Sequence, residues 1–232
     1  MGIIVAIGGG SMGWMAKNPE GVEYQTPVET THIDSAIIRL TQEAHPKVLY
    51  VGTASHDNPL YMETFRRQYV EHLGCTSAKA LNLDTEDLSY DDILKKVMAT
   101  DIIYVGGGDT TYMLKVWREK RFDEILRKAY QSGIVLSGMS AGAICWFDWY
   151  DNMDDVATLE ELDFVKGLSF INGFCVPHYE ELTKEEKQKI NSLLTEKELS
   201  GWALDNCSAI VFQDGKMEII SDHSGRTARK IP

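Results

Sequence analysis

Residues 134–143, Ile-Val-Leu-Ser-Gly-Met-Ser-Ala-Gly-Ala, limit most strongly what this chain can fold into. An apolar run of strand length ends in the sequence Gly-Met-Ser-Ala-Gly, and a segment suited to a helix follows. In a G-x-S-x-G turn the serine takes a strained backbone conformation, so its neighbours must be small. The hydroxyl of Ser140 then stands clear of the main chain, and the N–H of Ala141 points to where an oxyanion would form. The pattern favours a nucleophilic Ser140, although a serine that serves only the turn would give the same five letters.

Composition excludes several classes of function. The net charge is −12 and no basic run is present, which argues against nucleic acids and anionic membrane surfaces as partners. No stretch approaches the ~18 apolar residues that span a bilayer, and residues 3–7 run directly into a glycine loop, unlike a signal peptide. The four cysteines are far apart, so we expect reduced thiols in a cytoplasmic protein and no metal site.

Strands and helices alternate along the chain. The sequence predicts strands at 3–7, 47–51, 101–105, 134–137, 173–177, 208–212 and 217–220. It predicts helices at about 34–44, 60–73, 90–99, 111–132 with a break near Lys120, and 184–194 behind a capping box at Thr183. Continuous apolar runs are typical of strands buried on both faces. We therefore predict an α/β fold in which residues 1–232 form one domain around a single doubly wound, mostly parallel sheet with a C-terminal β-hairpin.

Glycine-rich or polar segments follow most of these strands, at the edge where ligands bind in such sheets. Two of the segments are triple glycines, Gly8–Gly10 and Gly106–Gly108. Together with Gly13, the first matches the spacing of a dinucleotide fingerprint, but Pro19, Gly21 and Pro27 interrupt the helix that the fingerprint requires. We therefore expect no nucleotide there. The second triple glycine suits one half of an oxyanion hole.

A serine nucleophile needs a base, and His178 is the best placed of the six histidines. It follows the apolar run 174–176 and Pro177 directly. A third group should hold the other nitrogen of the imidazole. Asp205 and Asn206 follow the next strand, and spacing does not decide between them.

The ordered set of motifs resembles the peptidase E family (family S51), serine peptidases related to aspartyl dipeptidases and cyanophycinases. The segments that carry the resemblance are Ile4–Gly10, Thr53–Asp57, Tyr61–Phe65, Ile102–Thr110, Gly138–Ala143 and Pro177–Tyr179. They occur in the family's order and span nearly the whole chain. The resemblance implies a flavodoxin-like fold similar to that of class I glutamine amidotransferases, in which the nucleophile of the elbow is a cysteine.

The resemblance also implies roles for individual residues. Ser140 would be the nucleophile and His178 the general base, with the N–H groups of Ala141 and Gly108 as the oxyanion hole. We expect Asp109 and Thr110, directly after this loop, to contact the substrate. No metal or cofactor is implied. Members of the family typically act on peptides next to an aspartyl residue and release a unit of dipeptide size.

Three positions depart from the family pattern. Asp109 stands where the family usually has Asn, and Asn206 stands where it usually has a triad Glu. An Asn can orient a histidine but cannot offset the charge of an imidazolium. The arginine that holds an aspartyl carboxylate is missing from residues 180–187, where Lys184 or Lys187 would be a poorer clamp. Strict aspartyl specificity is therefore not expected.

The expected function is hydrolysis of small peptides by a cytoplasmic serine peptidase, through an acyl-enzyme. Two alternatives stay open at this point. One is an esterase or amidase on the same scaffold, and the other is a binding member whose catalysis has weakened. The sequence does not determine the substrate or the oligomeric state, and a homodimer is among the assemblies that it allows.

Overall fold

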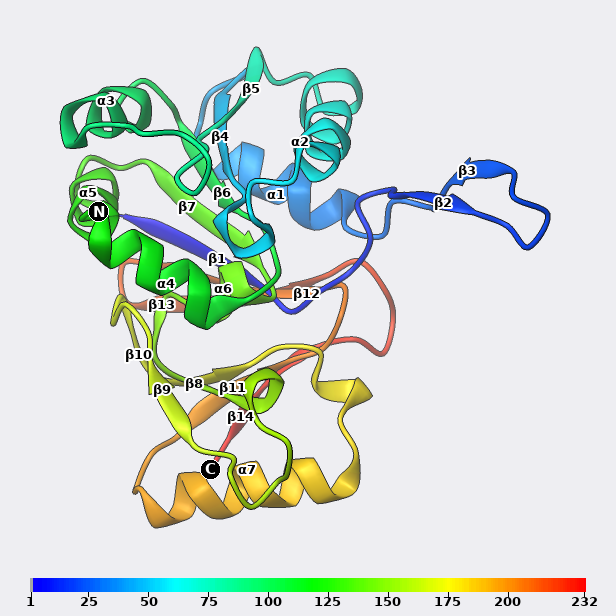
Figure 1. Cartoon of the computed structure of the whole chain (residues 1–232), viewed down its shortest axis with the longest axis vertical. Helices are drawn as coiled ribbons and strands as arrows, with labels where there is room; N and C mark the ends of the chain where they lie inside the picture. The colour runs from blue at the N-terminus through cyan, green and yellow to red at the C-terminus, as the bar shows by residue number, and fades with distance from the viewer. Residues whose placement is uncertain (1) are drawn as a thin grey trace.

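A seven-stranded sheet organises the larger part of the molecule, of which the computed structural model describes residues 2–232 (Figure 1). Its strands lie in the order β13 (Lys216–Ser221), β12 (Ser208–Gln213), β1 (Ile3–Ile7), β7 (Val135–Met139), β6 (Ile102–Val105), β4 (Lys47–Val51) and β5 (Ser77–Ala80). Five neighbouring strands are parallel: β1, β7, β6, β4 and β5. Strand β12 runs antiparallel to both β1 and β13. The prediction of a mixed α/β fold with a large, mostly parallel sheet is confirmed.

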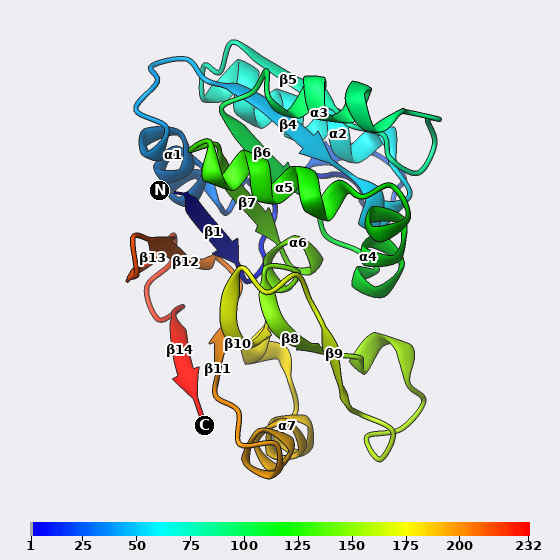
Figure 2. The same cartoon turned by 90° about the vertical axis from the view of Figure 1, so that its left-hand side faces the viewer.

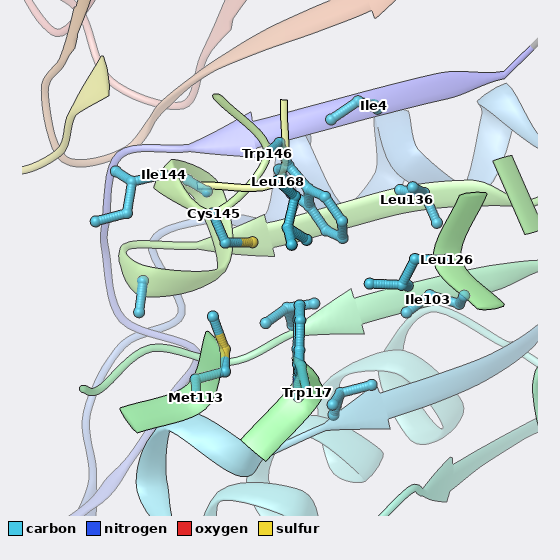
Figure 3. Packing of buried hydrophobic residues seen from close by; sticks show 14 of the residues in the cluster. Ile4, Ile103, Met113, Trp117, Leu126, Leu136, Ile144, Cys145, Trp146 and Leu168 are labelled. Carbon is cyan, nitrogen blue, oxygen red and sulfur yellow. The ribbon is translucent and has the colours of Figure 1, made fainter. Parts of the chain in front are cut away.

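Helices cover both faces of this sheet, which explains its continuous apolar strands. Alternate residues of β1 enter opposite cores: Ile4 packs with α3 (Tyr90–Val97), α4 (Thr110–Glu119) and α5 (Phe122–Gln131). Ile3 and Val5 pack with α1 (Thr31–Leu40) and α2 (Pro59–Arg66), which continues into the π-helical segment η2 (Arg67–His72). Figure 3 shows Trp117 and Leu126 reaching into the first core. Because every residue of β1 is buried, its sequence is apolar throughout.

A second, five-stranded sheet lies below the first in both views (Figures 1 and 2). Its order is β14 (Ala228–Ile231), β11 (Gly201–Leu204), β10 (Ile171–Val176), β8 (Phe147–Asp151) and β9 (Phe164–Lys166). Helix α7 (Lys184–Glu196) packs against it and begins at the predicted capping box of Thr183 and Glu186.

The prediction of a single sheet is therefore wrong. The sequence of β10 resembles that of a central strand of the first sheet because both faces of β10 are buried. Phe174 packs beside α7, while Cys175 belongs to the core of the larger sheet. An apolar run reveals that a strand is buried, but not which strand it pairs with.

The predictions for individual helices and turns are closer to the structure than the prediction of a single sheet. The predicted break near Lys120 is confirmed, because α4 ends at Glu119 and α5 begins at Phe122. Strands β2 (Met15–Lys17) and β3 (Glu23–Gln25) form an antiparallel pair where a dinucleotide fingerprint would need a helix. Strands β12 and β13 are joined through Asp214 and Gly215, which both have positive φ, as a tight turn between antiparallel strands requires.

Among residues 2–232, no helix combines the length and the apolarity that crossing a bilayer demands. The four cysteines are buried and form no disulfide with one another.

Candidate active site

The predicted site residues gather where strands of the two sheets end side by side. Ser140 follows β7 of the large sheet, whereas His178 follows β10 of the small one. The main-chain N–H groups of Ser140, His178 and Cys207 donate to three successive carbonyls, those of residues 7–9, at 3.0, 3.3 and 2.9 Å. The end of β1 thus holds three loops that come from distant parts of the sequence.

Ser140 has the strained backbone that the G-x-S-x-G pattern predicts. Its φ and ψ are 56° and −114°, at the point where β7 turns into the short helix α6 (Ala141–Ile144). A side chain at Gly138 would overlap the carbonyl oxygen of Gly142, and a side chain at Gly142 would overlap that of Val105. The glycines are therefore required by the close passage of the turn over β6. The result is a half-buried serine at the apex of the turn.

His178 lies within hydrogen-bond distance of Ser140 on one side and of Asn206 on the other. Its Nε2 is 2.9 Å from Ser140 Oγ, and its Nδ1 is 2.6 Å from Asn206 Oδ1. A Cβ at Gly9 would come within 2.5 Å of the imidazole Cε1 and would overlap Asn206 Oδ1. The imidazole and the amide therefore rest directly on the backbone of the first triple glycine.

Two glutamates of the 3₁₀ turn η4 (Tyr179–Glu181) orient Asn206. The Asn206 Nδ2 donates to Glu181 Oε1 at 2.5 Å, and its main-chain N–H donates to the carboxylate of Glu180. A carboxylate only accepts hydrogen bonds, so the amide nitrogen must face Glu181 and the amide oxygen must face His178. The Nδ1 of His178 then carries the proton, which leaves Nε2 free to accept the proton of Ser140.

Asp205, the other residue considered for this position, does not contact His178. Its carboxylate accepts a hydrogen bond from the N–H of Thr227 at 3.2 Å and pairs with Arg229. Its side chain is almost fully buried. Of the two residues, Asn206 is therefore the one that contacts the imidazole.

The second triple glycine lies beside Ser140. The Cα of Gly107 approaches Ser140 closely enough that an added Cβ would lie 3.4 Å from the Ser140 Cβ. Gly108 has φ of 136°, and a side chain there would overlap the carbonyl of Ala54. Within residues 2–232, the N–H groups of Gly108 and Ala141 donate no hydrogen bond to the protein. Both are therefore free to receive a ligand.

A cavity of about 260 Å³ opens beside Ser140 and His178. Gly108, Asp109, Thr110 and Ala141, all expected at the site, contribute to its lining. The Asp109 Oδ1 accepts from the N–H of Tyr112 at 2.7 Å, which caps α4. The substrate contacts expected of Asp109 and Thr110 stay predictions.

Another part of the cavity wall comes from β8 and the 3₁₀ turn η3 (Met153–Asp155). Five residues of this segment, all with polar side chains, line the cavity: Tyr150, Asp151, Asn152, Asp154 and Asp155. Burial raises the pKa of Asp151 to about 6, although the N–H of Met153 donates to its carboxylate. Thr111 of α4 donates to Asp155 Oδ2 at 2.8 Å, which ties the segment to the helix.

Neither lysine considered as a clamp for a substrate carboxylate lines this cavity. Lys187 lies with its Nζ 4.8 Å from the centre of the Tyr179 ring, and Lys184 begins α7. Outside the cavity, Glu29, Cys207 and His223 have potential metal-ligand atoms within 4.8 Å of one another. Burial, reinforced by the charge of Glu29, raises the pKa of the Cys207 thiol to about 11.

Sequence reasoning missed three parts of the site. It did not give Gly9 its place beneath His178, it did not connect Glu181 to Asn206, and it left the role of residues 148–161 open. The position of Glu181, three residues after His178, was the available signal, since a single turn brings such neighbours together. No local pattern indicated that the acidic segment would form a wall of the cavity.

Comparisons with known proteins identify the family of this chain. The model of peptidase family S51 matches residues 21–220. Uncharacterized peptidase YgaJ of Bacillus subtilis (strain 168) is 33% identical over 230 residues, covering 98% of this chain and 91% of that protein. Uncharacterized peptidase Lin0382 of Listeria innocua serovar 6a is 28% identical, covering 72% and 80%.

Two solved structures share the fold. A protein of Listeria monocytogenes EGD-e, provisionally named peptidase E, aligns with a TM-score of 0.69 at 16% identity, covering 95% of this chain and 98% of that one. A peptidase from an acI-B1 actinobacterium aligns with a TM-score of 0.69 at 18% identity, covering 100% and 94%.

Proposed function

This chain belongs to peptidase family S51, and from that premise we propose that it is a serine peptidase that cleaves small peptides through an acyl-enzyme on Ser140. The observation that carries the proposal is the unbroken hydrogen-bonded series from Ser140 Oγ through His178 to Asn206. A strained serine, a base within 2.9 Å and an orienting group on the far side of the base are what nucleophilic catalysis requires.

In this mechanism His178 acts first as a base and then as an acid. As Ser140 Oγ attacks the peptide carbonyl, its proton passes to Nε2 of the imidazole. The tetrahedral intermediate collapses when the imidazolium gives this proton to the leaving amine, which breaks the C–N bond. Water then enters, loses a proton to His178 and attacks the ester, and the proton returns to Ser140 as the acid product leaves.

The oxyanion of each tetrahedral intermediate would be held by the N–H groups of Gly108 and Ala141. Their freedom from hydrogen bonds within the protein supports this assignment. Because the glycine loop is fixed to Ala54 by the N–H of Asp109, at 2.8 Å, the donors are positioned before substrate arrives. Donors held in advance lower the barrier without a cost of reorganisation at the moment of reaction.

Asn206 would orient the imidazole but carries no charge of its own. The carboxylate of Glu181, bonded to the amide at 2.5 Å, places a negative charge one residue further from the imidazole. We propose that Asn206 and Glu181 together orient the imidazole and offset its positive charge, the role that a single triad carboxylate has elsewhere in the family. Charge developing on His178 would polarise Asn206 toward Glu181.

The size of the cavity supports a small substrate. About 260 Å³ accommodates roughly one or two residues of a peptide, which is consistent with dipeptidase-like cleavage. We also propose that the large sheet belongs to the doubly wound, flavodoxin-like class, because helices pack on both of its faces. We further propose that the enzyme is cytoplasmic, because its four cysteines are buried and form no disulfide with one another.

Hydrolysis of a dipeptide library tests the proposal, with Ser140→Ala as the inactive variant and Ser192→Ala, on the exposed side of α7, as the matched control. Ser140→Ala should lower kcat/KM at least about a thousandfold while leaving the melting temperature nearly unchanged. Ser192→Ala should retain full activity. Wild-type turnover by Ser140→Ala on a substrate that the protein cleaves would contradict the proposal.

A further inference from the structure

The cavity beside Ser140 is lined by acids and by no lysine or arginine. Asp109, Asp151, Asp154 and Asp155 all contribute to its surface, and His178 is the sole basic side chain among its lining residues. An anionic group of a substrate would enter against several negative charges with no counter-charge in reach. The chemistry of this lining is therefore opposite to that of a carboxylate-binding site.

Nothing in the described protein neutralises these acids. Ten ion pairs join side chains of residues 2–232, and none of them involves an acid of the cavity. Two arginines pair with acids close to the catalytic residues in sequence, Arg226 with Glu180 and Arg229 with Asp205. Arg118, close to Tyr150, donates to the carbonyl of Lys166 at 3.0 Å.

Asp151 is the most informative of the four acids. Its side chain is largely buried at the end of β8, and one of its oxygens accepts the N–H of Met153 at 3.1 Å. The residue also lines the cavity. Burial disfavours the ionised form of this carboxylate and raises its pKa to about 6. A cationic ligand in the cavity would favour the ionised carboxylate and could donate a charge-assisted hydrogen bond to it.

The wall that carries these acids is fixed. Thr111 joins Asp155 at 2.8 Å and lies 3.3 Å from the Tyr150 hydroxyl, so η3 is held against α4. Asp109 is fixed at the start of α4 by its bond to the N–H of Tyr112. The negative charges from these two segments therefore line the cavity without rearrangement, which lowers the cost of binding a cation.

We propose that the cavity selects a peptide with a positively charged group beside the cleaved bond, and rejects aspartyl and glutamyl peptides. This inference rests on the proposed function, because it takes the cavity as the substrate site. The shared chemistry is a protonated nitrogen, which either a lysine or arginine side chain or a free α-amino group can provide. The direction of selectivity is opposite to the aspartyl preference that the family resemblance implies.

Calorimetric binding to the Ser140→Ala protein tests the selectivity without requiring turnover. The probes are dipeptides X-Ala and Ala-X in which X is lysine, norleucine or glutamate, each with a free and with an acetylated N-terminus. Norleucine keeps the apolar length of lysine but lacks its charge. The best lysine peptide should bind about tenfold more tightly than its norleucine counterpart, and the glutamate peptide should bind most weakly.

Comparison of free and acetylated peptides identifies the source of the charge. A lysine preference that survives acetylation assigns the cavity to a side chain, and a loss of affinity on acetylation for every X assigns it to the α-amino group. Either result supports a cationic ligand. Raising the salt from about 0.05 M to about 0.5 M should reduce the preference, because the attraction is electrostatic.

A charge-matched pair of variants locates the effect. Asp154→Asn with Asp155→Asn should reduce the ratio of lysine to norleucine affinity at least about threefold. Asp214→Asn with Glu218→Gln, on β12–β13 at the edge of the large sheet, removes the same charge and should leave the ratio unchanged. If the acidic variants fail to fold, the salt dependence still decides the matter.

Two outcomes would overturn the inference: equal affinity for lysine, norleucine and glutamate peptides with no loss of affinity on acetylation, or the tightest binding by a glutamate peptide. Both could occur in a protein whose Ser140 is catalytic, so they would leave the proposed function standing. Conversely, preferential binding of cationic peptides with no cleavage by the wild-type protein would retain the selectivity and reject the peptidase proposal.

Discussion

The two triple glycines are identical in sequence but contribute to the site in different ways. Gly8–Gly10 ends β1 and lies beneath the imidazole of His178 and the amide of Asn206. Gly106–Gly108 ends β6, lies beside Ser140 and offers an unbonded N–H. The first loop thus acts through the side chains that rest on it, and the second through its own backbone. The comparison shows that a glycine motif at a strand end marks a close approach without indicating what approaches.

The middle glycines of the two loops give the sharpest contrast. Gly9→Ala places a methyl group where Asn206 Oδ1 and the His178 ring now lie, so both must move. We expect kcat to fall by about a thousandfold or more, approaching the loss of the base itself. Gly107→Ala is the matched control, because its methyl group would make an ordinary 3.4 Å contact with Ser140 Cβ. Steady-state kinetics on the best dipeptide should show this variant within about threefold of wild type.

Equal losses in the two variants would break the comparison, since they would show that neither loop tolerates a methyl group for general reasons of packing. Thermal melting of both proteins separates a displaced base from an unfolded chain.

Gly108→Ala should have the next largest effect. The residue has positive φ and its side chain would overlap the carbonyl of Ala54, so the loop and its N–H must shift. Loss of one oxyanion donor typically lowers kcat about a hundredfold. The change should appear in kcat and leave KM nearly constant. Gly215→Ala, at φ of 74° in an open turn, imposes backbone strain without a clash and should leave kcat unchanged.

Glu181→Gln is expected to have the smallest effect. The glutamine can still accept a hydrogen bond from Asn206, but it removes the charge behind the amide. We expect kcat to fall about tenfold with KM unchanged, because about 1.4 kcal/mol of the stabilisation of the imidazolium is lost. Glu185→Gln, on the first turn of α7, is the matched control and should not change kcat. An unchanged kcat in Glu181→Gln would limit Glu181 to a structural role.

Much of this site could be predicted from the sequence because strand ends carry strong local signals. Ser140 and His178 each follow an apolar run, and the spacing of small residues around Ser140 reflects a clash that any such turn must avoid. The choice between Asp205 and Asn206 could not be made, because it depends on the direction in which each side chain leaves the end of β11.

The second sheet and the acidic wall were beyond sequence reasoning for a related reason. Strand β8 contains Asp148 and Asp151 among its aromatic residues, so its pattern does not read as a buried strand. Its pairing with β10 and β9 is set by contacts that are distant in the sequence. Residues that depend on such pairing, Asp154 and Asp155 among them, become candidates for specificity once the fold is known.

The central claim is that Ser140 is a nucleophile activated by His178. Incubation with diisopropyl fluorophosphate, followed by intact-mass measurement and peptide mapping, tests it independently of the substrate. The account predicts one adduct per chain, on Ser140, and at least about a hundredfold slower labelling in His178→Ala. An unlabelled Ser140 in the folded wild-type protein, or labelling that does not depend on His178, would contradict it.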